Sequence, residues 1–471
     1  MKKYVKLAAC FVCALIASAQ LGSAQSSPSA YVYLLNSLTG NAVELDGYSA
    51  DSNGSLTLLL GSPFWTGATM DGWGLAHTAH WLFASDGVSI YSFSIASNGS
   101  LKEVSSINAQ QYTGNDNGET VGILTLDHTG STLYASMGDG TGDNQILFFQ
   151  KGSSGDLTYF GTTEVNNEYG VLNFLGNNQY AYGSGCFQAE GHFYGFSRAS
   201  DGSLTSFSPS MQDPTNPNGD YCDDLSAADP INHLAVSMYA ENFNPYSLGP
   251  PAYLAVYTAD SSGNLSTNST SQNMPSAAVG TTQDIKISPA GNLLSIAGTS
   301  GLQVFHFNGS NPITPYTGLI AAHNIRGLAW DANNHLFAIG SGKVNAFRVT
   351  STGYKQAPGS PYAINAIGLT VLSLSGSTAC APPSTAGVNI CSPANGSTDS
   401  SPVSVLAAAT ASSGLHITAT RLYVDAKSVY TSSSNTLSTS VSLSSGSHRL
   451  DVVGYENDGS AEKASETITV K

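Results

Sequence analysis

The chain has 471 residues, of which 10% are charged and 41% are hydrophobic, and its formal net charge is −16 at pH 7. The length is too great for one ordinary domain, and the hydrophobic share excludes an intrinsically disordered chain. An acidic chain offers no basic face to a phosphate backbone, so we expect no nucleic-acid partner. The 49 glycines and the many Ser, Thr and Asn residues are typical of short strands joined by turns.

Residues 1–24 have the pattern of a signal peptide. The basic start MKKYVK is followed by the apolar run LAACFVCALIASA and by LGSAQ, which ends in a small-x-small cleavage pattern. The apolar run is too short to span a membrane, and no later run is long enough either. We therefore expect a secreted, periplasmic or cell-surface protein with no membrane span.

A short turn sequence recurs through most of the chain. Glycine stands in these turns because a tight hairpin requires a positive φ. Recurrence of the same turn sequence along the chain indicates a repeat architecture. The clear copies are DSNGSL (51–56), ASNGSL (96–101), GSSGDL (152–157), ASDGSL (199–204) and DSSGNL (260–265), and the degenerate copies are NGSNPI (308–313) and STGY (351–354).

Each turn belongs to a unit of four strands. In the second unit, the short apolar strand GWGLAH (72–77) is followed by HWLFAS (80–85), by the aromatic strand IYSFSI (90–95) and by a fourth strand after the turn. Seven units with this order predict a β-propeller.

The first unit lacks its innermost strand, because its pattern begins directly with YVYLL (31–35). A strand of the inner type, AIGLTVLSLSG (366–376), follows the seventh unit without a unit of its own. We predict that it completes the first blade beside residues 31–35 and closes the ring, which removes the open sheet edges. The expected fold is all-β, with a seven-bladed β-propeller over 25–375 that its N- and C-terminal strands close.

A second domain is expected after the propeller. The Pro/Ser/Gly-rich segment 376–387 has the composition of a linker. Residues 388–471 then alternate polar and apolar side chains over short runs, with DAKS and SSGS as hairpin turns. This pattern predicts a small Ig-like β-sandwich.

Four cysteines remain after the leader, and an even number in an exported chain suggests two disulfides. Proximity in sequence favours Cys380–Cys391, which leaves Cys186–Cys222. In a propeller the latter two would lie on the same face of adjacent blades. No pair has the spacing of metal ligands.

Residues 31–376 resemble the seven-bladed lactonase-type propellers, which include 6-phosphogluconolactonase. The resemblance rests on units such as TVGILTLDHTGSTLYAS and NQILFFQKGSSGDLTYFG and on the ends GSPF and GSPY. It implies the propeller fold and, for an enzyme, ring opening of a lactone. The segment that begins CSPANGSTDSSPV is similar to bacterial Ig-like modules of exported proteins.

The enzymes of this family have histidine-containing segments at the start of their inner strands, and here only HNIRG offers a His/Arg pair. His323 and Arg326, with Glu119 or Glu168, could supply a general acid/base and oxyanion-stabilising set for lactone opening. The alternative is a hydrogen-bonded pair in a loop.

Asp223, Asp224 and Asp284 could bind Ca²⁺ through oxygen ligands, although no complete loop motif is present and solvated turns are the alternative. No other cofactor is expected. A structural role is expected for the histidines on or near the first hairpins of their units, which are His77, His80, His128, His233 and His335.

The expected function is that of an exported binding or scaffold protein that holds an extracellular polysaccharide or protein. The appended module favours it. The mouth of the ring also favours it, because the segments before the inner strands carry mostly acidic side chains there, whereas a phosphorylated lactone would need several cations around its phosphate. The alternative is an extracellular lactone hydrolase with its site at the ring mouth, which the family resemblance favours. A purely structural envelope component is the third possibility.

Overall fold

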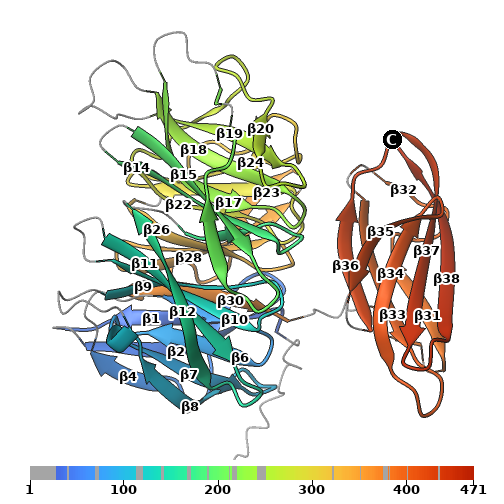
Figure 1. Cartoon of the computed structure of the whole chain (residues 1–471), viewed down its shortest axis with the longest axis horizontal. Helices are drawn as coiled ribbons and strands as arrows, with labels where there is room; N and C mark the ends of the chain where they lie inside the picture. The colour runs from blue at the N-terminus through green and yellow to red at the C-terminus, as the bar shows by residue number, and fades with distance from the viewer. Residues whose placement is uncertain are drawn as a thin grey trace, which may run out of the picture.

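The computed structural model describes residues 28–39, 42–68, 74–112, 120–138, 143–166, 171–187, 190–211, 213–214, 220–240, 251–320, 323–350, 352–374, 380, 382–383, 385–399, 401, 403–432 and 435–471. These residues are mostly in β-strands, as Figure 1 shows. The strands up to residue 373 form seven sheets, which are the blades of a propeller. The all-β fold class is confirmed.

Blade 1 joins the two ends of the propeller. Its inner strand comes from the C-terminal side and pairs antiparallel with the first strand of the chain, so that Tyr33 lies opposite Thr370. The prediction that the strand after the seventh unit supplies the missing strand of the first blade is confirmed over residues 366–373 (Figure 1). The strand order is β3 (Leu56–Leu58), β2 (Ala42–Ala50), β1 (Ala30–Ser37) and β30 (Ala366–Ser373), and β4 (Trp65–Ala68) also pairs with β2.

Blades 2 to 4 each pair four strands in chain order. A 3₁₀ turn, η1 (Gln110–Tyr112), follows blade 2. The strands are β5 (Leu75–His77), β6 (Trp81–Ser85), β7 (Ser89–Ile95) and β8 (Leu101–Asn108) in blade 2; β9 (Thr120–Leu126), β10 (Thr132–Gly138), β11 (Asp143–Lys151) and β12 (Leu157–Asn166) in blade 3; and β13 (Asn173–Phe174), β14 (Tyr180–Phe187), β15 (Glu190–Arg198) and β16 (Leu204–Phe207) in blade 4.

Blades 5 to 7 repeat this order, and β21 (Ser276–Ala277) adds to blade 5 by pairing with its third strand. The strands are β17 (Tyr221–Ala228), β18 (His233–Ala240), β19 (Ala252–Ala259) and β20 (Leu265–Thr267) in blade 5; β22 (Thr282–Ile287), β23 (Leu293–Gly298), β24 (Gly301–His306) and β25 (Thr314–Pro315) in blade 6; and β26 (Ile325–Trp330), β27 (His335–Gly340), β28 (Lys343–Thr350) and β29 (Gly353–Gln356) in blade 7.

The hydrophobic core of the propeller lies between the blades, because a single sheet must bury both of its faces against its neighbours. One cluster of buried side chains fills each interface between successive blades in the described part of the chain. Tyr33 and Phe93 meet between blades 1 and 2, and Val32 and Phe337 meet between blades 1 and 7. The inner strands β26, β30 and β5 also contact one another in series, so the ring is closed at blade 1.

The recurrent glycine turns connect neighbouring blades. Each turn joins the third and fourth strands of its blade, and in every blade except blade 7 its glycine lies against the second strand of the preceding blade. A Cβ atom at Gly155 would lie 2.3 Å from the ring of Trp81, and one at Gly202 would lie 2.3 Å from Thr132 Oγ1. We call this contact the turn latch. It recurs in the pairs Tyr31–Gly99, Trp81–Gly155, Thr132–Gly202, Tyr180–Gly263, His233–Gly309 and His335–Gly54.

Buried tyrosines add hydrogen bonds to three of these latches. The hydroxyl group of Tyr33 donates to the carbonyl oxygen of Gly99 (2.9 Å), and that of Tyr182 donates to Gly263 (2.6 Å). Tyr134 makes the same bond to Gly202 (2.6 Å). Glycine is therefore required at these turns both for its positive φ and because the preceding blade leaves no room for a side chain.

Residues 387–470 form a β-sandwich around a separate hydrophobic core. Val405 and Leu437 of one sheet and Leu422 and Val452 of the other are among its fully buried side chains. One sheet has the order β31 (Gly387–Ser392), β33 (Val403–Thr410) and β36 (Thr436–Val441), and the other has the order β32 (Thr398–Asp399), β38 (Ala461–Val470), β37 (Gly446–Glu456), β34 (Ile417–Val424) and β35 (Lys427–Ser432).

The turn latch predicts an unequal effect of two glycine substitutions. Gly155 and Gly61 have similar φ values of +84° and +91°, but an added Cβ at Gly61 would approach no atom closer than 3.6 Å. Gly155→Ala should therefore lower the free energy of unfolding by about 1–3 kcal/mol more than Gly61→Ala does, because only the first forces Trp81 to move. Denaturant unfolding of the two variants measures the difference. Equal losses would show that the latch contributes nothing beyond the backbone conformation.

Candidate functional site

The predicted catalytic residues that the structure describes lie at the start of the inner strand of blade 7. His323 precedes β26 and Arg326 is its second residue, and both are exposed. The backbone carbonyl of His323 accepts a hydrogen bond from Ser341 Oγ (2.7 Å), and no ion pair of either side chain with another described residue is found. Glu119 and Glu168 lie outside the described residues, so the proposed set stays a prediction.

The three aspartates considered as Ca²⁺ ligands lie on two inner strands, and two of them, Asp224 and Asp284, bond to protein groups. Asp224 of β17 accepts a hydrogen bond from the hydroxyl group of Thr282 on β22. Asp284 of β22 accepts one from the backbone N–H of Leu328 on β26 (2.7 Å) and pairs with Lys286 Nζ (2.9 Å). These carboxylates therefore join successive inner strands. Among the described residues, no group of three or more His, Cys, Asp or Glu side chains could hold a metal ion.

Asp223 is buried beside Asp224, with 2% of its surface exposed. Burial raises its pKa well above the ordinary value, and the nearby carboxylates of Asp213 and Asp224 raise it further. Burial also raises the pKa of Asp224 to about 6, although its hydrogen bond from Thr282 opposes this shift. Because a raised pKa disfavours the charged carboxylate, Asp223 is less suited than an ordinary aspartate to bind Ca²⁺.

The structure contains both disulfides expected from the sequence. Cys186, near the end of β14, is bonded to Cys222 at the start of β17, with their Cα atoms 5.3 Å apart. This bond ties blade 4 to blade 5. Cys380 is bonded to Cys391 of β31, with a Cα separation of 5.2 Å.

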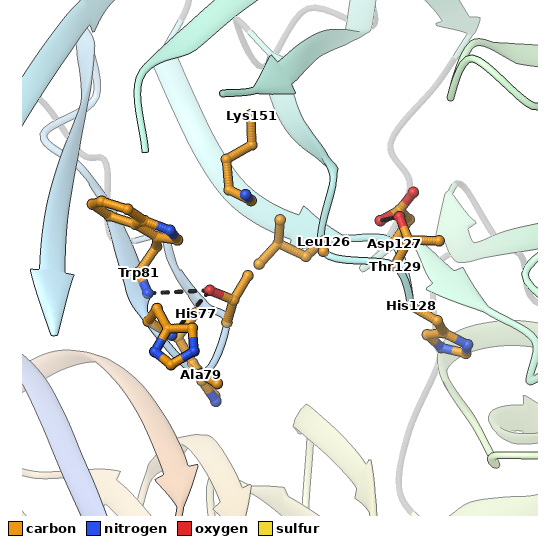
Figure 2. A pocket seen from close by; sticks show the side chains of 11 residues that line it. His77, Ala79, Trp81, Leu126, Asp127, His128, Thr129 and Lys151 are labelled. Carbon is orange, nitrogen blue, oxygen red and sulfur yellow. Dashed lines mark hydrogen bonds between the residues drawn. The ribbon is translucent and has the colours of Figure 1, made fainter. Parts of the chain in front are cut away.

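A hollow of about 470 Å³ lies where the first hairpins of blades 2 and 3 meet (Figure 2). Its walls come from the hairpin between β5 and β6, the hairpin between β9 and β10, and the end of β11. We call it the hairpin hollow. Its lining residues are His77, Thr78, Ala79, His80, Trp81, Leu126, Asp127, His128, Thr129, Gly130 and Lys151.

The blade 2 hairpin is held by local bonds and by the turn latch. Thr78 Oγ1 accepts hydrogen bonds from the backbone N–H groups of His80 (3.3 Å) and Trp81 (3.1 Å), as the dashed lines in Figure 2 show. The Trp81 ring is placed against Gly155 of blade 3. The aromatic wall of the hollow is therefore fixed before any ligand arrives.

His77 contributes a neutral imidazole to the floor of the hollow. Its Nδ1 lies 2.8 Å from Thr370 Oγ1 of β30, and burial lowers its pKa to about 4. Lys151 points toward His77 and Trp81 from the opposite side (Figure 2). Lys151 Nζ lies 3.4 Å from the carbonyl oxygen of Gly152, and no ion pair with a described carboxylate is found. The hollow thus combines an aromatic ring, an ammonium group and a neutral nitrogen heterocycle.

Asp127 stabilises the wall of the hollow through bonds that occupy its carboxylate. Its buried side chain forms an ion pair with Arg198 of blade 4 and accepts hydrogen bonds from Thr129 Oγ1 (2.8 Å) and Ser131 N (3.1 Å). The adjacent His128 ring packs edge-on to Phe174, and burial lowers its pKa. Because Asp127 is committed to these partners, it is a poor general base. The hollow has the chemistry of a binding site.

Sequence reasoning missed the hairpin hollow because it treated all the hairpin histidines alike. His233 and His335 do have structural roles, since each contacts the aspartate four residues earlier, at 2.7 Å and 2.6 Å, and packs on the next turn. In blade 2 the latch residue is Trp81, and the residue four positions before it is His77 in place of an aspartate. The triplet His77, His80 and Trp81 in a hairpin without a capping aspartate was the available signal.

The low pKa of His77 predicts a pH-dependent contribution to stability. The folded chain keeps His77 neutral, whereas an unfolded histidine, with a pKa of about 6.5, takes up a proton as the pH falls. This contribution is complete above about pH 6.5 and is lost as the pH falls toward about 4. His77→Asn retains a polar group toward Thr370 and removes the titration. The variant should therefore lose less free energy of unfolding than the parent between about pH 7 and pH 4. Identical pH profiles in denaturant titrations would contradict this.

Comparison with known proteins identifies the two folds. Residues 387–452 match the family model described as "Bacterial Ig domain". The structure of a putative 6-phosphogluconolactonase from Bacteroides fragilis is similar, with 12% sequence identity and a TM-score of 0.55, over 74% of this chain and 99% of that chain. The periplasmic gluconolactonase PpgL from Pseudomonas aeruginosa is also similar, with 13% identity and a TM-score of 0.51, over 73% of this chain and 99% of that chain. A search of curated protein sequences found no match.

Two further observations concern the location of the protein. Disulfides and a bacterial Ig domain fit an extracellular location. No described helix is both long and apolar enough to cross a membrane. The chain thus joins a β-propeller of the fold found in 6-phosphogluconolactonase-like lactonases to a bacterial Ig domain.

Proposed function

We propose that this protein is an extracellular binding protein and that the hairpin hollow takes a sugar unit that carries an acidic group. One observation carries the proposal: an aromatic ring, an ammonium group and a neutral imidazole converge on an open hollow of about 470 Å³. A volume of this size lies in the range of small-molecule sites.

Each wall of the hollow matches one part of such a ligand. The Trp81 ring offers an apolar surface for the face of a sugar, and its indole N–H is a donor. The ammonium group of Lys151 attracts a carboxylate, and within the described residues no carboxylate already neutralises it. The neutral His77 can donate or accept a hydrogen bond without adding charge.

Binding is favoured over catalysis in the hollow because its carboxylate and its buried imidazole are unsuited to act together as a general acid/base pair. Asp127 is held by Arg198, Thr129 and Ser131, and His77 is too weak a base at neutral pH with a pKa of about 4. General acid–base catalysis requires groups whose pKa values lie near the working pH.

The second candidate is a lactone hydrolase with its site at the ring mouth. Its support is the likeness in fold to structures described as gluconolactonases, together with the exposed His323 and Arg326 at the start of one inner strand. At 12–13% identity this likeness concerns the fold, and the activity of those proteins does not transfer with it.

Replacing Lys151 tests the proposed binding site. Lys151→Gln should weaken binding of digalacturonate about 10- to 100-fold, because one charge-assisted hydrogen bond contributes about 1.5–3 kcal/mol. Tryptophan fluorescence, with Trp81 in the hollow wall, reports the titration. Lys102→Gln removes the same charge from an exposed position on the outer strand β8 of blade 2 and should bind as the parent does.

Three outcomes of this titration would contradict the proposal. They are no binding by the parent, equal losses in the Lys151 and Lys102 variants, and retention of full affinity by Lys151→Gln. Binding that depended instead on His323 or Arg326 would support a site at the ring mouth.

A further inference from the structure

We propose that the outer face of the five-stranded sheet of the Ig domain binds a carboxylated polysaccharide. The surface consists of Arg421, Tyr423, Arg449, Tyr455 and Lys463, and we call it the cationic tyrosine face. It is a different surface from the hairpin hollow, and the inference does not depend on the function proposed there.

Strand alternation brings these five side chains to one side of three adjacent strands. Within β34, Leu422 is fully buried while its neighbours Arg421 and Tyr423 are partly exposed. The register of the sheet sets Arg421 opposite Val453 of β37, and sets Val453 opposite Lys463 of β38. The residues of the cationic tyrosine face are therefore neighbours across the sheet, although they span more than 40 positions in the chain.

The two tyrosines form a fixed pair in the middle of this face. Their hydroxyl oxygens lie 2.6 Å apart, and the guanidinium carbon of Arg421 lies 5.4 Å from the centre of the Tyr455 ring. Arg421 Nε also donates to Thr431 Oγ1 (3.1 Å), which holds the guanidinium in place. Cation–π contact and hydrogen bonding thus order the aromatic surface, so that less entropy is lost when a ligand settles on it.

The outer positions of these strands carry a local excess of positive charge. Arg421, Arg449 and Lys463 supply three cations, and Asp451 supplies one carboxylate, which leaves a net charge of +2. This excess stands out in a chain whose net charge is −16. An exposed cationic patch of this kind attracts anions through its local field.

The contacts of Asp451 show that this face accommodates a carboxylate. Arg449 Nε and Lys463 Nζ each lie 3.1 Å from the same carboxylate oxygen of Asp451. The side chains of Arg449 and Lys463 remain 60% and 49% exposed, so each keeps N–H donors that face solvent. A ligand carboxylate can bind to these donors while Asp451 keeps its own contacts.

The occupant that fits is an extended chain of sugars with repeated carboxylates. Sugar rings can lie on the tyrosines, and carboxylates can alternate with the exposed cations on either side. A nucleic acid fits less well, since its dense phosphates call for a basic face that a net charge of +2 does not supply.

Binding of the full chain to immobilised polygalacturonate tests the inference. The double variant Arg449→Gln/Lys463→Gln should bind at least about 10-fold more weakly than the parent, and binding by the parent should weaken as salt rises from about 50 mM to about 300 mM. The matched control is Arg348→Gln/Lys355→Gln, which removes two exposed cations that face each other across β28 and β29 of blade 7. It should bind as the parent does.

A charge-preserving variant separates loss of charge from loss of structure. Arg449→Lys/Lys463→Arg should retain most of the binding, and its thermal unfolding should match that of the glutamine variant. The inference is overturned if the parent does not bind, if both glutamine doubles bind equally, or if double-stranded DNA binds more tightly than polygalacturonate. It is also overturned if Lys151→Gln alone abolishes polymer binding, because the polymer would then be held by the hairpin hollow.

Discussion

Contact between successive blades is the constraint on which the propeller depends. Each blade is one twisted sheet whose two faces can be buried only against its neighbours, so no blade has a core of its own. The turn latch sets this packing at six of the interfaces, where a glycine turn meets the second strand of the preceding blade. At the inner part, Asp224 and Asp284 do the same by bonding to the next inner strand. The ring then closes only because β1 and β30 share blade 1.

The hairpin hollow follows from this packing. Trp81 is a latch residue that lies on Gly155, and the same ring forms the aromatic wall of the hollow. His77 reaches Thr370 of blade 1, so the floor of the hollow depends on the strand that closes the ring. A site built in this way is held by three blades and needs little rearrangement to bind a ligand.

Much of the fold could be read from the sequence because its signals are local. The glycine turns mark the units, and the unpaired strand at 366–376 has one vacant place to fill beside β1. The disulfide partners follow from their number and order. The turn latches could not be predicted from the sequence. The positive φ of a hairpin turn already accounts for each turn glycine, so nothing in the sequence indicates its contact with the neighbouring blade. The role of Asp284 could not be predicted either, because the hydrogen bond that it accepts from Leu328 N depends on how two blades pack together.

The candidate site was harder to predict for the same reason. Lys151 lies more than 70 positions after His77 and His80, and no spacing rule joins it to them. Local pattern led instead to the aspartates of β17 and β22, which contact protein groups. The Arg421–Tyr455 contact likewise could not be predicted from the sequence, because it depends on the register between β34 and β37.

In an acidic protein with few lysines and arginines, the surroundings of each cation are informative. Arg198 and Lys286 each pair with an aspartate, and these two residues hold blades together or stabilise a strand. Lys151 differs from them, since it points into an open hollow beside an aromatic ring (Figure 2). This difference separates a cation that serves the fold from one that is available to a ligand.

The most direct test of ligand binding in the hairpin hollow is hydrogen–deuterium exchange. It is measured on the full chain with and without digalacturonate. Exchange should slow in residues 77–81 and 126–130, which line the hollow, and should stay unchanged around His323 and Arg326. Slower exchange around residues 323–326 alone would contradict it and would move the ligand to the mouth of the ring.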